Sequence, residues 1–272
     1  MLSFYKFLII YTFFCLSCAD IYAQHTHIVG DSVEFIVDRP GIADLPYTVK
    51  PHQYQLEVGF ERIDRKDYFR WLAPTFLLRT GISDKAEIRF GTKYIVQDSL
   101  TDLSEPFNWD SGFAPLSIGF KTKMVSENGI IPEIALLTDI LLPFTKSEYR
   151  AKYSGHDIFL LMNHTLNKKW NLNTNVGAIW ENVSNEAIWM YAFCLDYQPT
   201  RRLGFFLEQY TYLPDESPTE IGFDVGITYL VAPKMQFDVS AGISKVNNNL
   251  MNFVGCGFTI RIDRKKNPNI RN

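Results

Sequence analysis

The sequence has few cysteines, no long apolar run in its main part and no strong charge of either sign. Cys15 and Cys18 lie in an N-terminal apolar stretch, so Cys194 and Cys256 remain, too few for a disulfide framework or a cysteine metal site. No later stretch has about 18 uninterrupted apolar residues, which argues against a helical membrane protein. The formal charge of -3 gives no electrostatic basis for binding nucleic acid. We therefore expect no nucleic-acid partner, and no cofactor or metal ion.

Aromatic residues, by contrast, are abundant. The chain contains 21 Phe, 14 Tyr and 5 Trp among 272 residues, and its mean hydropathy of -0.08 is near zero. This combination suits a protein in which half of the strand positions face lipid and half face water.

The N-terminus has the pattern of a secretory signal peptide. Lys6 supplies a positive charge, residues 7–16 are apolar, and small residues follow up to Ala23. We expect residues 1–23 to be removed. Residues 24–51 contain several prolines and cannot form a central strand, so this extended segment is predicted either to lie along the periplasmic rim of a barrel or to enter its lumen as a plug. Residues 263–272 form a basic tail.

Residues 170–180 carry the clearest strand signal. Apolar side chains and Thr174 occupy every second position from Trp170 to Trp180, and the positions of the other parity are mostly polar, with Asn171, Asn173, Asn175 and Gly177. This is the period of a strand with two unlike faces. Ten steps of about 3.3 Å on a strand tilted by about 40° cover roughly 25 Å, the height of the lipid-facing band of an outer-membrane barrel.

The same alternation recurs along the chain and predicts about twelve strands, an even number as in single-chain bacterial barrels. The predicted strands are 53–61, 68–80, 86–96, 113–124, 131–142, 156–166, 170–180, 187–197, 203–213, 220–231, 235–244 and 252–262. Tight turns are predicted at 82–85, 126–129, 167–169, 199–202 and 232–234. Longer links are predicted between them, above all at 97–112 and 144–155. Short turns mark the periplasmic rim, where both termini are then expected.

A soluble antiparallel sandwich would also alternate, but its strands average about five or six residues, half the length of those predicted here. Strands of this length span a membrane when tilted, and a closed barrel leaves no exposed edges. The sequence thus predicts an all-β fold, an antiparallel transmembrane β-barrel over residues 52–262 in the bacterial outer membrane. Its expected partners are outer-membrane lipids, the barrel assembly machinery and a small-molecule solute.

Two sets of residues are the candidate functional positions. The polar parity of the strands predicts charged side chains of both signs in the lumen: Glu57, Glu61, Glu87, Arg89, Lys93, Lys121, Lys123, Glu133, Asp139, Asp224, Asp238 and Arg261. Four aromatic residues are predicted at the membrane interfaces: Trp170, Trp180, Trp189 and Tyr197. Mixed charges would pair across the lumen and narrow it, which argues against a wide porin of one sign. They could instead be salt bridges that only keep the barrel rigid.

Several motifs resemble those of a known family. Asp38-Arg39-Pro40, Pro46-Tyr47-Thr48-Val49, residues 53–60, residues 77–82 and residues 113–121 are similar to the family labelled "putative MetA-pathway of phenol degradation". The resemblance covers residues 35–262 and implies an outer-membrane β-barrel transporter, with aromatic compounds as the solutes that the label suggests. Residues 41–44 are less polar than is usual there. The chain ends in Asn272 rather than an aromatic residue, so we expect the assembly machinery to recognise residues 258–262.

The predicted function is a passive transporter or channel for small solutes, hydrophobic or aromatic ones included, with selectivity in loops 97–112 and 144–155 and in the N-terminal segment. A second hypothesis is an outer-membrane lipid hydrolase, for which His164 beside Asn163, with Ser154 or Ser184 as the nucleophile, is the local candidate. The His-x-Ser-Asn-Gly signature of phospholipase barrels is missing, so we expect no enzyme. His25 and His27 are too few for a metal site. A structural barrel without a transport role is the third hypothesis.

Overall fold

The computed structural model describes residues 35–66, 68–99, 110–142, 154–181 and 186–264. Most of these residues lie in thirteen β-strands: β1 (Gln53–Arg65), β2 (Tyr68–Ser83), β3 (Ala86–Ser99), β4 (Asp110–Phe113), β5 (Leu116–Val125), β6 (Glu133–Leu142), β7 (Gly155–Thr165), β8 (Trp170–Trp180), β9 (Ala187–Tyr197), β10 (Leu203–Pro214), β11 (Glu220–Ala232), β12 (Met235–Val246) and β13 (Asn249–Asp263). No helix in the described part of the chain is long and apolar enough to span a membrane.

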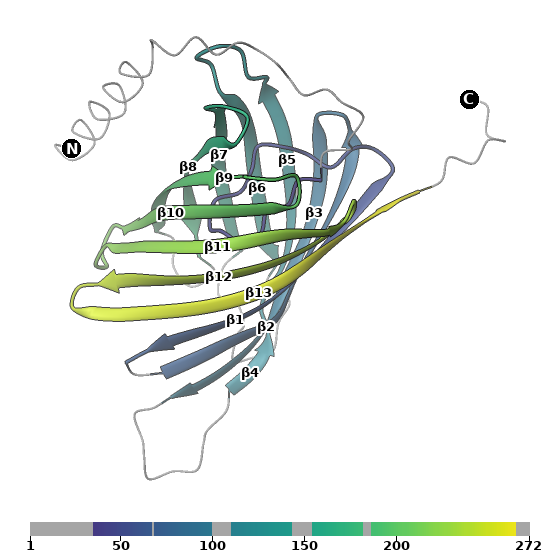
Figure 1. Ribbon diagram of the computed structural model, residues 1–272. Helices are drawn as coiled ribbons and strands as arrows, with labels where there is room; N and C mark the ends of the chain where they lie inside the picture. Colours follow the sequence, from purple (N-terminus) through teal and green to yellow (C-terminus); the bar gives the residue numbers. More distant parts are fainter. Residues whose placement is uncertain (1–34, 67, 100–109, 143–153, 182–185, 265–272) are drawn as a thin grey trace.

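The strands close into a barrel. Apart from β4 and β5, which do not pair with each other, strands that follow one another in sequence pair antiparallel, and β1 also pairs with β13 from Gln53↔Asp263 to Arg65↔Met251. The short β4 and the longer β5 pair with different parts of β3. Together they occupy the position of one strand, so the barrel has twelve strand positions. Figure 1 shows the tilted strands around a common interior.

The predicted strand series is confirmed with one correction. Strands β8 and β9 have the predicted bounds, and the others differ by a few residues at their ends. The exception is the predicted strand 113–124, which is broken between β4 and β5 at Ala114 and Pro115. Proline has no N–H to donate to the ladder, and the strand breaks where it lies.

The two rims of the barrel differ in their connections. At one end, which we call the short-turn rim, the links are 84–85, 126–132, 166–169, 198–202 and 233–234. The predicted tight turn at 126–129 is longer than expected, because Asn128 and Ile131 form a small bridge of their own. The opposite end is the long-loop rim. Its two longest predicted links lie mainly in 100–109 and 143–153, outside the described residues, as do the predicted signal peptide and most of the basic tail.

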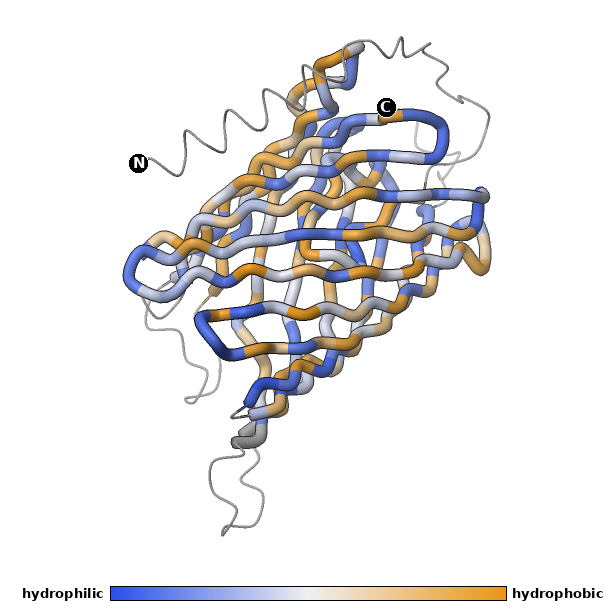
Figure 2. The backbone as a smooth tube through the Cα atoms, turned by 60° about the vertical axis from the view of Figure 1, so that its left-hand side comes forward, coloured by the Kyte–Doolittle hydropathy of each residue, from blue (hydrophilic) through white to orange (hydrophobic). Residues whose placement is uncertain are grey.

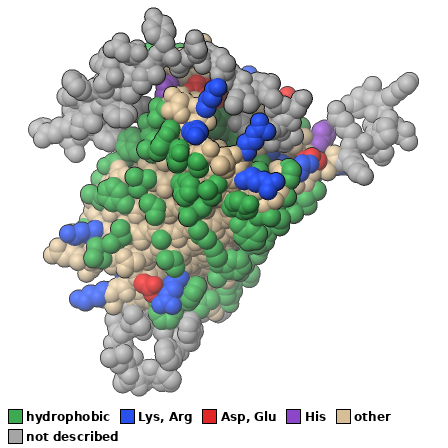
Figure 3. All heavy atoms as spheres, viewed as in Figure 1, with side chains coloured by type: hydrophobic (Ala, Val, Ile, Leu, Met, Phe, Trp, Pro, Cys, Tyr) green, Lys and Arg blue, Asp and Glu red, His purple; other side chains and the backbone are tan. Residues whose placement is uncertain are grey.

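Apolar side chains cover the outside of the barrel. Phe76, Phe90, Phe223 and Val254 are among the many large apolar residues that remain exposed, and they come from strands all around the ring. Figure 2 shows the alternation of hydropathy along each strand, and Figure 3 shows hydrophobic side chains over the strands, with charged ones gathered near the strand ends. Such a band is suited to a hydrocarbon environment. Cys194 is buried and Cys256 is exposed, and both are free.

The N-terminal segment, residues 35–52, runs inside the barrel (Figure 1). Arg39 hydrogen-bonds Asp238 on β12, Ile42 and Ala43 hydrogen-bond Glu208 on β10, and Val49 hydrogen-bonds Glu87 on β3. These strands belong to different sides of the ring, and one segment can reach them all only from the interior. The described residues 35–52 therefore lie in the lumen, and residues 24–34 of the predicted segment are outside the described residues.

Candidate functional site

A buried ion-pair network fills the lumen near the short-turn rim. At its centre is Arg79 on β2, whose side chain is 1% exposed. Its guanidinium donates to Glu57 at 3.0 Å and to Glu87 at 2.8 Å, and it also donates to the backbone oxygen of Tyr47 at 3.0 Å. Glu57, Arg79 and Glu87 lie on the adjacent strands β1, β2 and β3, where the side chains of one parity face the interior.

The N-terminal segment adds Asp38 to this network. One carboxylate oxygen, Oδ2, accepts from Lys121 Nζ at 2.7 Å, and Arg79 Nη1 and Arg89 Nη1 lie 3.0 and 3.3 Å from it. The other oxygen accepts the backbone N–H of Leu45 at 3.3 Å. Asp38 is thus held by three cations from β2, β3 and β5, and a charge so deeply buried requires such partners.

Further hydrogen bonds hold the N-terminal segment to other sides of the lumen. The Glu208 carboxylate accepts the backbone N–H groups of Ile42 and Ala43 at 2.7 and 2.9 Å. Asn163 on β7 donates to the hydroxyl of Tyr47 at 2.8 Å. Arg39 donates to Asp238 at 3.3 Å. Contacts with strands on opposite sides hold the segment across the interior. We call residues 35–52 together with these partners the floor.

Two acidic groups of the segment differ in pKa. Burial by itself would raise the pKa of Asp38, but Arg79, Lys121 and Arg89 hold it well below its usual value. Burial raises the pKa of Asp44 to about 6, because Arg89, 3.3 Å away, offsets only part of the desolvation. Asp38 is therefore charged at all physiological pH values, whereas Asp44 titrates near neutrality.

Beyond the floor, toward the long-loop rim, inward side chains become accessible. Along β3, Glu87 and Arg89 are buried, but Lys93, four residues on and of the same parity, is exposed. Along β1, Glu57 is buried and Glu61 is half-buried, and along β6, Glu133 is buried and Asp139 is half-buried. Since all these side chains point inward, the lumen holds solvent-accessible space on this side. We call it the vestibule.

Apolar side chains also pack inside the lumen, in buried clusters. Strands β9, β10 and β13 supply Met190, Ala192, Phe206, Tyr210 and Phe253 to one cluster, and Phe159, Ile179, Tyr212 and Ile63 pack against it. Ile42 and Ala43 of the floor belong to the same cluster. A second apolar cluster contains Leu72, Ile95 and Ala114, again with Ile63. The interior above the floor therefore combines buried apolar clusters with the charged side chains of Glu61, Lys93 and Asp139.

The predicted lumen positions divide between these two regions. Eight of the twelve candidates are buried, namely Glu57, Glu87, Arg89, Lys121, Glu133, Asp224, Asp238 and Arg261. Glu61, Lys123 and Asp139 are half-buried, and Lys93 is exposed. The ion pairs of these residues join adjacent strands, such as Lys123 with Glu133, or are made with residues of the N-terminal segment. Direct pairing across the lumen, as the mixed charges suggested, does not occur among the described residues, because the segment lies between the walls.

The predicted interface aromatics lie at both ends of the strands. Trp170 is the first residue of β8 and stacks on Tyr197, the last of β9, with ring centroids 4.4 Å apart. Trp180 ends β8 and stacks on His156 at 4.4 Å. Trp189, near the start of β9, is exposed. Their contact with the lipid interface stays a prediction.

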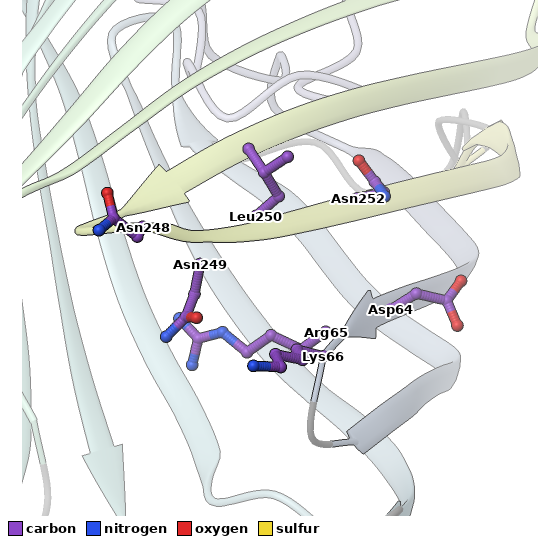
Figure 4. A pocket seen from close by; sticks show the side chains of 7 residues that line it. All are labelled: Asp64, Arg65, Lys66, Asn248, Asn249, Leu250 and Asn252. Carbon is purple, nitrogen blue, oxygen red and sulfur yellow. The ribbon is translucent and has the colours of Figure 1, made fainter.

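A shallow pocket of about 330 Å³ lies at the long-loop rim (Figure 4). It lies between the end of β1, with Arg65 and Lys66, and the hairpin that joins β12 to β13, with Asn248 and Asn249. Strand β13 extends beyond the end of β1, which ends opposite Met251, and this overhang creates the hollow. The pocket is open and remote from the floor.

The residues considered for a hydrolase are dispersed. Asn163 points inward to Tyr47, whereas its neighbour His164 lies 3.5 Å from Glu127 near the short-turn rim. Ser154 precedes β7 at the opposite rim, and Ser184 lies outside the described residues. No group of three or more metal-ligating side chains occurs in the described ranges, which do not include His25 and His27.

Sequence reasoning missed four central residues of the site: Arg79, Asp38, Glu208 and Asn163. Arg79 lies in a stretch where Trp71 and Pro74 blur the alternation, and the register of β2 shifts there. A signal was present, because an arginine after Leu77 and Leu78 in a membrane strand must face inward. Asp38 carried no periodic signal, since its segment has none.

Comparison with known proteins agrees with this architecture. The model of the family described as "Putative MetA-pathway of phenol degradation" matches residues 37–262. The chain belongs to this family. No curated protein matches the sequence.

Among solved structures, this member of the phenol-degradation family is similar to the COG4313 outer membrane channel from Pseudomonas putida F1. The TM-score is 0.62 at 12% identity, over 82% of this chain and 99% of that one. The NanC porin matches with a TM-score of 0.52 at 7% identity, over 76% of this chain and all of the porin. At such identities the likeness concerns the fold, which is that of bacterial outer-membrane barrels, and it agrees with the apolar exterior. The chain is an outer-membrane β-barrel.

Proposed function

We propose that this barrel is a passive channel for small solutes, hydrophobic and aromatic ones included, and that residues 35–52 close it at the short-turn rim. The observation that carries the proposal is the contrast between an accessible vestibule and a sealed floor in one lumen. A barrel that served only as a rigid structure would need no solvent-accessible space above a separate closing segment.

The lining of the vestibule supports small solutes with apolar bodies. Phe159 and Tyr212 are half-buried beside the buried cluster of Phe206, Tyr210 and Phe253, and aromatic rings offer large apolar contact area to a passing solute. The mixed charges argue against a wide porin whose whole lining carries one sign of charge. The phenol named in the family description agrees with this direction.

The floor supports a closed resting state. The network of Arg79, Glu57, Glu87 and Asp38 is buried, so passage requires the segment to move from at least some of its anchors. Those anchors are hydrogen bonds and ion pairs rather than covalent links, and local opening of such a segment costs less than unfolding the barrel.

The test is solute flux into liposomes. We expect the full-length protein to admit small aromatic and aliphatic solutes slowly, and a variant with a weakened floor, Glu208→Ala, to admit them faster. Lys168→Gln, at an exposed turn, serves as the control and should behave as the wild type. If neither the wild type nor Glu208→Ala admits any solute while both are folded, the barrel is structural and the channel proposal is wrong. Lipid hydrolysis by the same liposomes would support the enzyme hypothesis instead.

A further inference from the structure

We propose that the site that holds Asp38 is a binding site for the carboxylate of a small, apolar organic acid, and that Asp38 occupies it as a stand-in for this ligand. The inference rests on the proposed function and names a class of solute for it.

The first argument is geometric. Lys121 Nζ, Arg79 Nη1 and Arg89 Nη1 converge on one oxygen of Asp38 within 3.3 Å. All three belong to the barrel wall, on β5, β2 and β3, and none to the segment that they hold. The wall thus presents a preformed set of donors, and charged donors of this kind bind carboxylates strongly. We call these three side chains the carboxylate socket.

The second argument is the balance of charge. The wall supplies two carboxylates to the socket, Glu57 and Glu87, which contact Arg79 at 3.0 and 2.8 Å. The segment supplies Asp38 and also Asp44, which lies 3.3 Å from Arg89, so two segment carboxylates complete the pairing of these cations. If the segment withdraws, both carboxylates leave, and buried cations without anionic partners are very costly. A carboxylate that enters the vacated place restores part of this pairing.

The third argument is the surroundings of the socket. Ala43 precedes Asp44, which itself pairs with Arg89 at 3.3 Å, and Ala43 and Ile42 pack against the apolar cluster that contains Phe206 and Tyr210. The segment therefore connects the socket with this apolar cluster, which lies on β9, β10 and β13. An acid bound by its carboxylate could direct an apolar or aromatic body toward this cluster, which the short side chain of Asp38 does not do.

Exchange of one carboxylate for another explains how a solute could loosen the floor at small cost. The wall cations lose their ion pairs with Asp38 and regain them with the solute. The equilibrium between the docked and the released segment then depends on the remaining hydrogen bonds and ion pairs of the segment and on the apolar contacts of the solute. The solute then favours the released state by its differential affinity for that state. A neutral molecule of the same shape regains no ion pair and cannot compete.

The first experiment uses the unmodified full-length protein in detergent. Benzoate is the probe, and benzamide is its neutral counterpart of similar shape. We expect benzoate to accelerate hydrogen exchange at the backbone amides of residues 41–50, which include the donors to Glu208, Asp38 and Glu87, whereas benzamide leaves it unchanged. Equal effects of both compounds, or no effect of either, would overturn the proposal.

The second experiment measures binding directly. We expect Asp38→Ala to bind benzoate at least tenfold more tightly than the wild type does, because competition is removed, and at least tenfold more tightly than it binds benzamide. Arg89→Gln in the same background should remove this preference. Arg65→Gln, which alters the rim pocket, should leave it unchanged. A lost preference in Arg65→Gln would assign the binding to the rim pocket and contradict the socket.

Two controls keep the result decisive. Asp38→Asn keeps the volume of the side chain and replaces Asp38→Ala if that variant does not fold, as judged by the gel shift between boiled and unboiled samples. Binding in detergent needs no transport, so the two proposals fail separately. Selective benzoate binding without liposome flux would reject the channel and keep the socket, whereas flux without selective binding would reject the socket and keep the channel.

Discussion

The floor and the vestibule belong to the same lumen and are built by the same strands, yet they differ in chemistry and in access. Within six residues of β3, the inward side chain changes from the buried Glu87 to the exposed Lys93. Pairing with β2 runs along β3 from Ala86 to Ser99 with short irregularities, and on the other side the partner changes from β5 to β4 beside Lys93. The difference comes from the N-terminal segment, which fills one end of the lumen and leaves the other end open. One chain can therefore provide both a rigid barrel and a separate closure.

The largest expected effect is at the centre of the floor. Arg79→Ala would leave Glu57, Glu87 and Asp38 with an uncompensated buried charge, and removal of one partner from a buried ion pair costs about 3–5 kcal/mol. We expect a large loss of stability in urea, measured by the gel shift of the folded barrel. The matched control is Arg62→Ala, whose ion pair with Asp64 at 2.7 Å is solvent-exposed and should contribute little to stability. Similar losses in both variants would remove the distinction between the floor and the exterior.

A smaller effect should separate the floor from the wall. The backbone of the segment passes close to Gly81 on β2, where an added Cβ would lie 2.2 Å from the Val49 oxygen. Gly81→Ala should therefore displace the segment at a cost of about 1–3 kcal/mol and increase solute flux, while the barrel stays folded. Gly255→Ala is the control, because its nearest neighbour is the Ser240 hydroxyl at 3.3 Å, which can rotate. Unchanged flux in Gly81→Ala would mean that the segment does not close the channel.

The floor should also respond to pH through Asp44. Its pKa is about 6 in the docked state, above the usual value of about 3.9, so docking takes up a proton. Docking is then strongest below about pH 4 and weakens as the pH rises through about 6. Because the Asp44 side chain is 23% exposed, we expect an effect of about 1–2 kcal/mol.

Hydrogen exchange of residues 41–50 at pH 5 and pH 8, corrected for the intrinsic rates, measures this change. Exchange protection should be higher at pH 5. Asp44→Asn should give the same protection at both values, and a pH dependence that persists in this variant would assign the effect to another group.

The smallest effect concerns the exterior. Trp170→Leu removes the stacking on Tyr197, which is worth about 0.5–1.5 kcal/mol, and leaves the floor untouched. We expect slightly lower stability in lipid and unchanged solute flux. A change in flux would show that the exterior and the lumen are coupled, contrary to their separation here.

Much of the barrel could be predicted from the sequence, because one periodicity encodes it. Alternation gave the strands, and the bounds of β8 and β9 were correct because tryptophans and tyrosines mark their ends. The break between β4 and β5 at Pro115 was not predicted, although the proline is visible in the sequence, because alternation continues on both sides of it. The predicted solute path and the interface role of the aromatics stay predictions.

The floor could not be predicted, for a physical reason. Its contacts join residues far apart in sequence, such as Asp38 with Lys121 and Ile42 with Glu208, 166 positions apart. No local pattern encodes such pairs. The side chains of the wall could be assigned to the interior by parity, but their partners depend on where an aperiodic segment lies, and only the three-dimensional structure contains this information.

The position of Arg39 has a consequence for biogenesis. Its guanidinium lies against Gly59 and Gly257, which face each other across the contact between β1 and β13, and it donates to the carbonyl of Cys256, 217 residues away. This binding place does not exist until the last strand to be synthesised has joined the first. The lumen is therefore closed only in a finished barrel, and a chain that stalls during insertion keeps its N-terminal segment loose and open to periplasmic proteases.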